Sequence, residues 1–156
     1  MASGEGTESS GIPAWVWWLL AAVAIALAVA VPLILRNRRR AVWQADFATA
    51  KEDVVWFARS LVPQLRQSGT LDQLSGGWRI GSPRVAGTED RLTVLESSAP
   101  RDEDGAAARA LRDAVRASRD QMRALLANGD SSAISPDLDE IAARLEAALA
   151  PPPPVE

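Results

Sequence analysis

An uninterrupted apolar segment near the start is the strongest pattern in the chain. Residues 15–35 read WVWWLLAAVAIALAVAVPLIL and contain no charged side chain. As an α-helix, this segment would be about 32 Å long, close to the hydrocarbon thickness of a bilayer, about 30 Å. A helix that is apolar on every face is typical of a membrane span, whereas the helix of a soluble domain has a polar side. The pattern therefore predicts a transmembrane helix over residues 15–35.

The two flanks of this segment predict an uncleaved anchor and its orientation. Three tryptophans gather at its first end, where indole rings favour the membrane interface. Residues 36–40, RNRRR, follow it, whereas residues 1–14 contain two glutamates and no basic side chain. A cleaved signal peptide would need a basic start and a shorter apolar core. The positive-inside rule predicts a single pass through the cell membrane, with residues 1–14 outside, residues 36–40 as a basic juxtamembrane segment and residues 41–150 in the cytoplasm.

Beyond the arginines, apolar residues recur every three or four positions, which is the period of an amphipathic helix and, in heptads, of a coiled coil. No stretch alternates as a strand would for more than a few residues. The pattern predicts an all-α fold, in which the transmembrane helix precedes a small antiparallel bundle of three or four helices. The predicted core positions are Trp43, Phe47, Ala50, Val54, Phe57 and Leu61; Val85, Thr88, Leu92, Leu95 and Ala99; Ala108, Leu111, Val115, Ser118, Met122 and Leu125; and Leu138, Ile141, Leu145 and Ala148 or Leu149.

Prolines and glycines predict where these helices end. Pro63 predicts a kink or break near Leu61 and Val62, because proline cannot donate to the helix and clashes with the preceding turn. The glycine-rich stretch 68–81, SGTLDQLSGGWRIG, predicts irregular structure, with the next helix beginning at Ser82–Pro83. Further boundaries are expected at Pro100, at Asn128–Gly129, at Ser135–Pro136 and at Pro151, where a proline-rich tail, residues 151–156, begins.

The arginines between residues 109 and 123 fall away from the apolar seam of their helix. Arg109–Asp113 and Arg116–Asp120 have the i,i+4 spacing of ion pairs along one helix, in the weaker orientation. Arg112 and Arg119 are expected to be exposed. Their replacement by alanine should therefore change stability by no more than about 0.5 kcal/mol.

Composition excludes several classes of chemistry. The chain has no cysteine, histidine or tyrosine. It therefore has no disulfides, no zinc finger, no usual haem or iron–sulfur ligands, and no Ser-His-Asp or Cys-His nucleophile pair. Residues 41–156 contain 13 basic and 18 acidic side chains, so we expect no binding to nucleic acid.

Two motifs invite a catalytic or metal-binding interpretation. Leu74-Ser75-Gly76-Gly77 resembles the signature of ABC transporter ATPases, but those enzymes need a Gly-Lys-Ser/Thr phosphate loop. The only lysine is Lys51, in Ala-Lys-Glu, so we interpret residues 74–77 as a glycine turn that lets Trp78 fold back onto the bundle. Two acidic clusters lack the spacing of a calcium loop and coincide with predicted helix starts, where carboxylates are favoured without metal. They are Asp102, Glu103 and Asp104, and Asp137, Asp139 and Glu140. We therefore expect no catalytic, cofactor-binding or metal-binding residue.

The remaining unusual features are the aromatic side chains and the proline run. Trp43, Trp56 and Trp78, with Phe47 and Phe57, are expected in the core; Trp43 has the alternative of resting in the inner headgroup layer. Pro151–Pro154 has two interpretations, a disordered tail end and an extended polyproline segment read by a partner.

The order of the segments resembles that of uncharacterised single-pass membrane proteins of high-GC Gram-positive bacteria. The stretches that carry this resemblance are DFATAKEDVVWFARSLVPQLRQ and RLTVLESSAPRDEDGAAARALRDAVRASR. The resemblance implies a bacterial membrane location and transfers no catalytic residue.

These patterns predict a non-enzymatic, membrane-anchored interaction or scaffold protein. Its cytoplasmic helices would bind a protein partner or a second copy of the chain, while the lipid bilayer holds its anchor. The alternative is a membrane-tethered regulatory domain that senses a small ligand between its helices.

Overall fold

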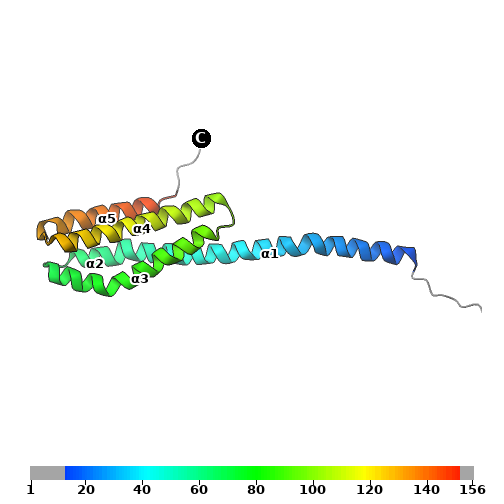
Figure 1. Cartoon of the computed structure of the whole chain (residues 1–156), viewed down its shortest axis with the longest axis horizontal. Helices are drawn as coiled ribbons and strands as arrows, with labels where there is room; N and C mark the ends of the chain where they lie inside the picture. The colour runs from blue at the N-terminus through cyan, green and yellow to red at the C-terminus, as the bar shows by residue number, and fades with distance from the viewer. Residues whose placement is uncertain (1–12, 152–156) are drawn as a thin grey trace, which may run out of the picture. The chain divides into compact units, whose positions relative to one another are not determined.

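The computed structural model describes residues 13–151, and every element in this part of the chain is helical (Figure 1). No strand occurs within it, as the all-α prediction requires. The chain divides into two compact units, which meet between Arg39 and Arg40.

The first unit contains the apolar start of helix α1 (Ala14–Trp56), which includes Pro32. Of its residues from 15 to 39, only Val16 is half-buried, and the others are exposed. This is the single helix among the described residues that is long and apolar enough to cross a membrane. The exposed apolar side chains of this helix fit the sequence pattern of residues 15–35, which has no polar face.

The second unit is a helical bundle that begins with the later part of α1. In it, α3 packs against α4 and α4 against α5, while α2 contacts both α3 and α5, so that these helices lie side by side (Figure 1). Its elements after α1 are the π-helix η1 (Phe57–Leu61), α2 (Val62–Arg66), α3 (Leu71–Ser97), α4 (Asp102–Asn128), the 3₁₀-helix η2 (Ser131–Ala133) and α5 (Ile134–Leu149).

The predicted seams form most of the core of the bundle, which also includes Leu65, Leu74 and Ile134. All six predicted positions of α4 are buried, as are the predicted positions of α1 and η1 except the half-buried Phe47. In α5, Leu149 is buried and Ala148 is only half-buried, which decides between the two candidates. The indole N–H of Trp43 donates to the backbone oxygen of Leu95 at 2.9 Å. Trp43 is therefore a core residue that ties α1 to the end of α3.

Of the kink or break predicted near Leu61 and Val62, the break does not occur. The chain remains helical from α1 to the end of α2, and one π-helical stretch, η1, precedes the proline. There the backbone N–H of Val62 donates to the oxygen of Phe57, five residues back. A wider turn makes room for the proline ring and absorbs the lost hydrogen bond. The helix continues because Val62 and Leu65, beyond the π-turn, are buried in the same core.

The prediction that residues 68–81 are irregular holds for residues 68–70 and is wrong for residues 71–81, which are helical. Helix α3 begins at Leu71, with Thr70 as its N-cap, whose hydroxyl accepts a hydrogen bond from the backbone N–H of Gln73 at 3.3 Å. The Gln73 side chain in turn accepts from the backbone N–H of Gly69 at 2.9 Å. This reciprocal arrangement is a variant of the capping box, and the sequence Thr-Leu-Asp-Gln contains its pattern.

Helix α3 passes through its glycines and Pro83 because its buried face is continuous. Leu74, Trp78 and Gly81 precede Val85 at spacings of four, three and four, and all are buried. Pro83 lies on the exposed side. Burial of this seam outweighs the intrinsic cost of glycine in a helix, about 1 kcal/mol each.

The remaining helix ends follow the sequence closely. Helix α4 begins two residues after Pro100 and ends before Gly129, whose φ of 68° is the left-handed conformation that favours glycine. Helix α5 begins at Ile134, one residue before the predicted Ser135, and ends two residues before Pro151.

Candidate functional site

Two glutamates of α3 and four arginines of α4 form a ladder of ion pairs between the two helices. Glu89 accepts a hydrogen bond from Nε of Arg116 at 2.8 Å and also pairs with Arg119. Glu96 accepts from Nε of Arg109 at 2.6 Å and also pairs with Arg112. The two glutamates are seven residues apart, as are the corresponding arginines, so the ladder repeats with the heptad of the core.

The ladder corrects the expectation for these arginines. Arg109 and Arg116 pair across to α3, and neither pairs with the aspartate four residues ahead of it within the described structure. The side chains of Arg112 and Arg119 are only 17% and 21% exposed, so the expectation that they lie in solvent is wrong. The heptad spacing of Glu89 and Glu96 was a signal in the sequence, but pairing between helices depends on which faces meet.

The ladder holds Glu89 in its ionised form. Partial burial acts to raise the pKa of this carboxyl, but the hydrogen bonds and charges of Arg116 and Arg119 outweigh it, and the pKa is lowered. A carboxylate kept ionised in this way has no proton to donate near neutral pH, so Glu89 is not suited to act as a general acid.

A second cluster joins α1 to α3. Asp53 accepts hydrogen bonds from Arg84 at 2.7 Å and from Arg91 at 2.8 Å, and its side chain is 16% exposed. The Arg84 guanidinium lies 4.1 Å from the ring centre of Trp56, a cation–π contact. This arrangement fixes α3 on α1 and leaves no acidic group of the cluster unpaired.

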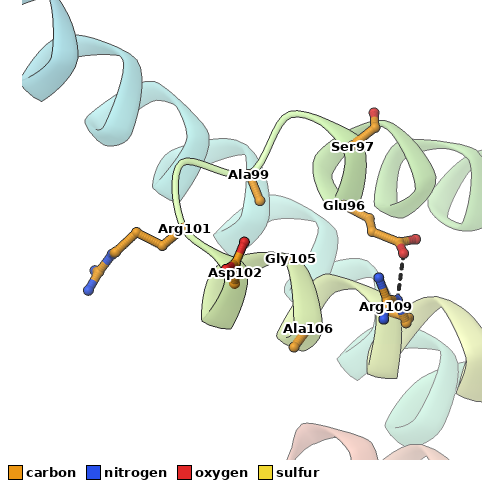
Figure 2. A pocket seen from close by; sticks show the side chains of 8 residues that line it. All are labelled: Glu96, Ser97, Ala99, Arg101, Asp102, Gly105, Ala106 and Arg109. Carbon is orange, nitrogen blue, oxygen red and sulfur yellow. Dashed lines mark hydrogen bonds and ion pairs between the residues drawn. The ribbon is translucent and has the colours of Figure 1, made fainter.

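A polar pocket of about 390 Å³ lies where α3 turns into α4 (Figure 2). In Figure 2, the side chains of Glu96 and Arg109 point toward one another, and Arg101 points away from them. Arg101 pairs with Glu103 and, at 3.4 Å, with Asp104. The charges around this pocket therefore neutralise one another. Its lining residues are Glu96, Ser97, Ala99, Arg101, Asp102, Gly105, Ala106 and Arg109.

A larger and more apolar groove, of about 540 Å³, lies between α1, α4 and α5. Buried Leu111 and Leu149 and half-buried Phe47 contribute to it, and Lys51 is the one basic residue on its rim. The remaining lining residues are Glu103, Ala106, Ala107, Ala110, Ala147, Ala148, Ala150 and Pro151. We name this feature the alanine groove. Sequence reasoning missed it, because its alanines belong to helices whose packing the sequence does not specify.

The motif at residues 74–77, which resembles an ATPase signature, is part of a regular helix. Residues 74–77 lie within α3 and do not form the predicted turn; Leu74 is buried, and Gly77 lies against Leu65. Trp78 is nevertheless in the core, as predicted, with its ring centre 6.0 Å from that of Phe57.

Neither acidic cluster gathers as a metal site would. Among residues 13–151, no three Asp, Glu, His or Cys side chains are placed to hold one ion. Asp137 and Glu140 accept hydrogen bonds from the Gln121 amide at 3.0 and 2.9 Å, and Asp139 pairs with Arg66. Residues 102–104 form the first turn of α4. Residues 152–154 of the proline run lie outside the described residues.

Comparison with known proteins adds nothing to this description. No family model matches the chain, and no curated protein and no solved structure matches it either.

Proposed function

We propose that this is a single-pass protein of the bacterial cell membrane, with its N-terminus outside and its helical bundle in the cytoplasm, where the bundle acts as a non-enzymatic interaction module. The observation that carries the proposal is the exposed, uncharged helical stretch of residues 15–35, followed by RNRRR. Such a surface is stable in hydrocarbon and unstable in water. The carboxylates that pair with arginines across helices support a structural role for the charges of the bundle.

The proposal includes an antiparallel arrangement of the bundle helices. The order of the contacts supports it. Glu96, late in α3, meets Arg109, early in α4, whereas the earlier Glu89 meets the later Arg116. Likewise Gln121, late in α4, bonds to Asp137, early in α5. Short connections between successive helices favour the same arrangement.

Reporter fusions test the proposed orientation. A C-terminal fluorescent protein should fluoresce, and a C-terminal reporter active only outside the cytoplasm should be silent. Replacing the four arginines of residues 36–40 with asparagine should produce mixed orientations, because they supply the charge asymmetry. Activity of the outside reporter in the unaltered protein would contradict the proposal.

The exposed face of α3 supports the interaction role. Ile80 is 83% exposed and Val94 is 63% exposed, and among the described residues after Val42 they are the large apolar side chains left in solvent. Gly87 lies midway between them, seven residues from each, and no described side chain or other helix approaches within 4 Å of where its Cβ would be. An apolar pair that flanks an open glycine would let another helix approach closely.

Site-specific photocrosslinking tests this face in cells. A photoreactive amino acid at Ile80 or Val94 should give a discrete crosslinked species, whereas the same residue at exposed Ala143 of α5 should not. Co-expression of two differently tagged chains shows whether the captured species is a second copy. Equal, diffuse crosslinking at all three positions would contradict a specific interaction through α3.

The alanine groove supports a second candidate function, a membrane-tethered domain that senses a small ligand. Its volume of about 540 Å³ is within the range of ligand sites, about 300–1,000 Å³. Its lining is mainly apolar with one cationic group, which is the usual composition of such a site.

A further inference from the structure

We propose that the alanine groove binds a free long-chain fatty acid, with the acyl chain along the alanines and the carboxylate on Lys51. This inference rests on the second candidate function, ligand sensing, and names the class of ligand.

The lining of the groove fits a single acyl chain. Ala106, Ala107, Ala110 and Ala147 are exposed, although they lie next to the core. Their small side chains leave a continuous hollow where larger residues would fill the space between α4 and α5. Buried Leu111 and Leu149 add further apolar surface. An acyl chain in this hollow would remove apolar area of both partners from water.

The charge of the groove indicates an anionic head group. Lys51 is the only lysine in the chain and takes part in none of the ion pairs found among residues 13–151. Glu103, the acidic residue on the rim, is paired with Arg101. An unpaired ammonium beside apolar surface favours a carboxylate attached to an acyl chain. One cation and one hollow of about 540 Å³ match one carboxylate and one chain, rather than a phospholipid with two chains.

Photoaffinity labelling of the full-length protein in phosphatidylcholine nanodiscs tests the proposal. A palmitate probe with a diazirine near the end of its chain should label peptides that contain Ala106–Leu111 or Ala147–Pro151. Unlabelled palmitate should compete, and hexadecanol, which lacks the charge, should compete about tenfold less well. Lys51→Met should reduce labelling at subsaturating probe by about tenfold, as loss of one charge-assisted hydrogen bond predicts. Arg79→Met, at an exposed arginine of α3 outside the groove, should leave it unchanged.

A matched pair of variants tests the shape of the groove. Ala110 and Ala117 are both exposed on α4 and lie seven residues apart, but only Ala110 lines the groove. Ala110→Leu should abolish labelling of the groove, and Ala117→Leu should leave it unchanged. Circular dichroism of both variants verifies that the helices are retained.

Three results would overturn the inference. Labelling confined to residues 15–35 would mean that the probe reports only the bilayer. If hexadecanol competed as well as palmitate, the carboxylate would contribute nothing to binding and Lys51 would not be its partner. Crosslinks between two chains through the groove, in place of probe labelling, would make a second copy the occupant. These results would not change the outcome of the reporter fusions or of crosslinking at Ile80. A failure of the fatty-acid proposal can therefore be distinguished from a failure of the proposed membrane-anchored interaction function.

Discussion

At the residue scale, Ser118 is the most completely buried polar side chain of the bundle, and its hydroxyl has no hydrogen-bond partner among residues 13–151. An unsatisfied buried hydroxyl is destabilising. Ser118→Ala should therefore raise the free energy of unfolding by about 1 kcal/mol, measured by denaturant titration with tryptophan fluorescence. Ser82→Ala, at a half-buried position of α3 whose hydroxyl makes no hydrogen bond among residues 13–151, reports the gain in helix propensity that both changes share. An equal gain in both variants would contradict the explanation.

Glu89 makes stability depend on pH. Its pKa is lower in the folded chain than the ordinary value of 4.5, so its ionised form stabilises the fold at neutral pH. This stabilisation should be lost as the pH falls from about 4.5 through the folded pKa. The stability difference between the unaltered chain and Glu89→Gln should therefore shrink in acid. Melting temperatures of both proteins from pH 7 down to about 3 measure this difference. A difference that is constant across this range would contradict a lowered pKa of Glu89 in the folded chain.

The ion pairs of α4 differ in how far they are exposed to solvent, and we expect their contributions to stability to differ accordingly. Arg112→Ala removes a 17% exposed guanidinium from the equally covered Glu96, which should cost about 1–3 kcal/mol of stability. Arg123→Ala breaks a pair with Asp120 in which the side chains are 60% and 61% exposed, and should cost less than about 0.5 kcal/mol. Chemical denaturation of the two variants, side by side, measures the contrast. Equal costs would mean that burial of the pair is unimportant.

At the scale of elements, the glycines of α3 differ in what surrounds them. A Cβ at Gly81 would lie 2.7 Å from Cδ2 and 2.8 Å from Cδ1 of Leu61, whereas at Gly87 it would have no neighbour within 4 Å. Gly81→Ala should lower stability by about 1–3 kcal/mol through overpacking. Gly87→Ala should raise it by about 0.5–1 kcal/mol, because alanine is the better helix former. Thermal unfolding followed by circular dichroism would show shifts of opposite sign, and shifts of the same sign would contradict the close approach of α3 to η1.

At the scale of the whole molecule, the question is whether the core of the bundle is complete within one chain. Phe57 is 1% exposed in a single copy, so Phe57→Ala should cost about 3–5 kcal/mol. The unfolding midpoint of the unaltered chain should not change when protein concentration is varied about a hundredfold. A midpoint that rises with concentration would show that the seams pack only in an oligomer.

The sequence by itself determined the features that depend on local pattern. The uncharged stretch of residues 15–35 specifies a helix that is apolar on every side, because none of its residues could form a charged face toward water. The heptad of Ala108 to Leu125 specifies the buried face of α4, and Gly129 specifies its end, because both depend only on residues near in the chain.

Only the tertiary structure decided the features that depend on a neighbouring helix. Gly81 and Pro83 predict a break when α3 is considered alone, but the packing of that helix on Leu61 and Leu65 keeps it continuous. The choice of Glu89 and Glu96 as partners of the α4 arginines, and the hollow beside Lys51, arise where separate helices meet. Burial between helices contributes more free energy than local preference does, and the sequence of one helix does not state which face of another it will meet.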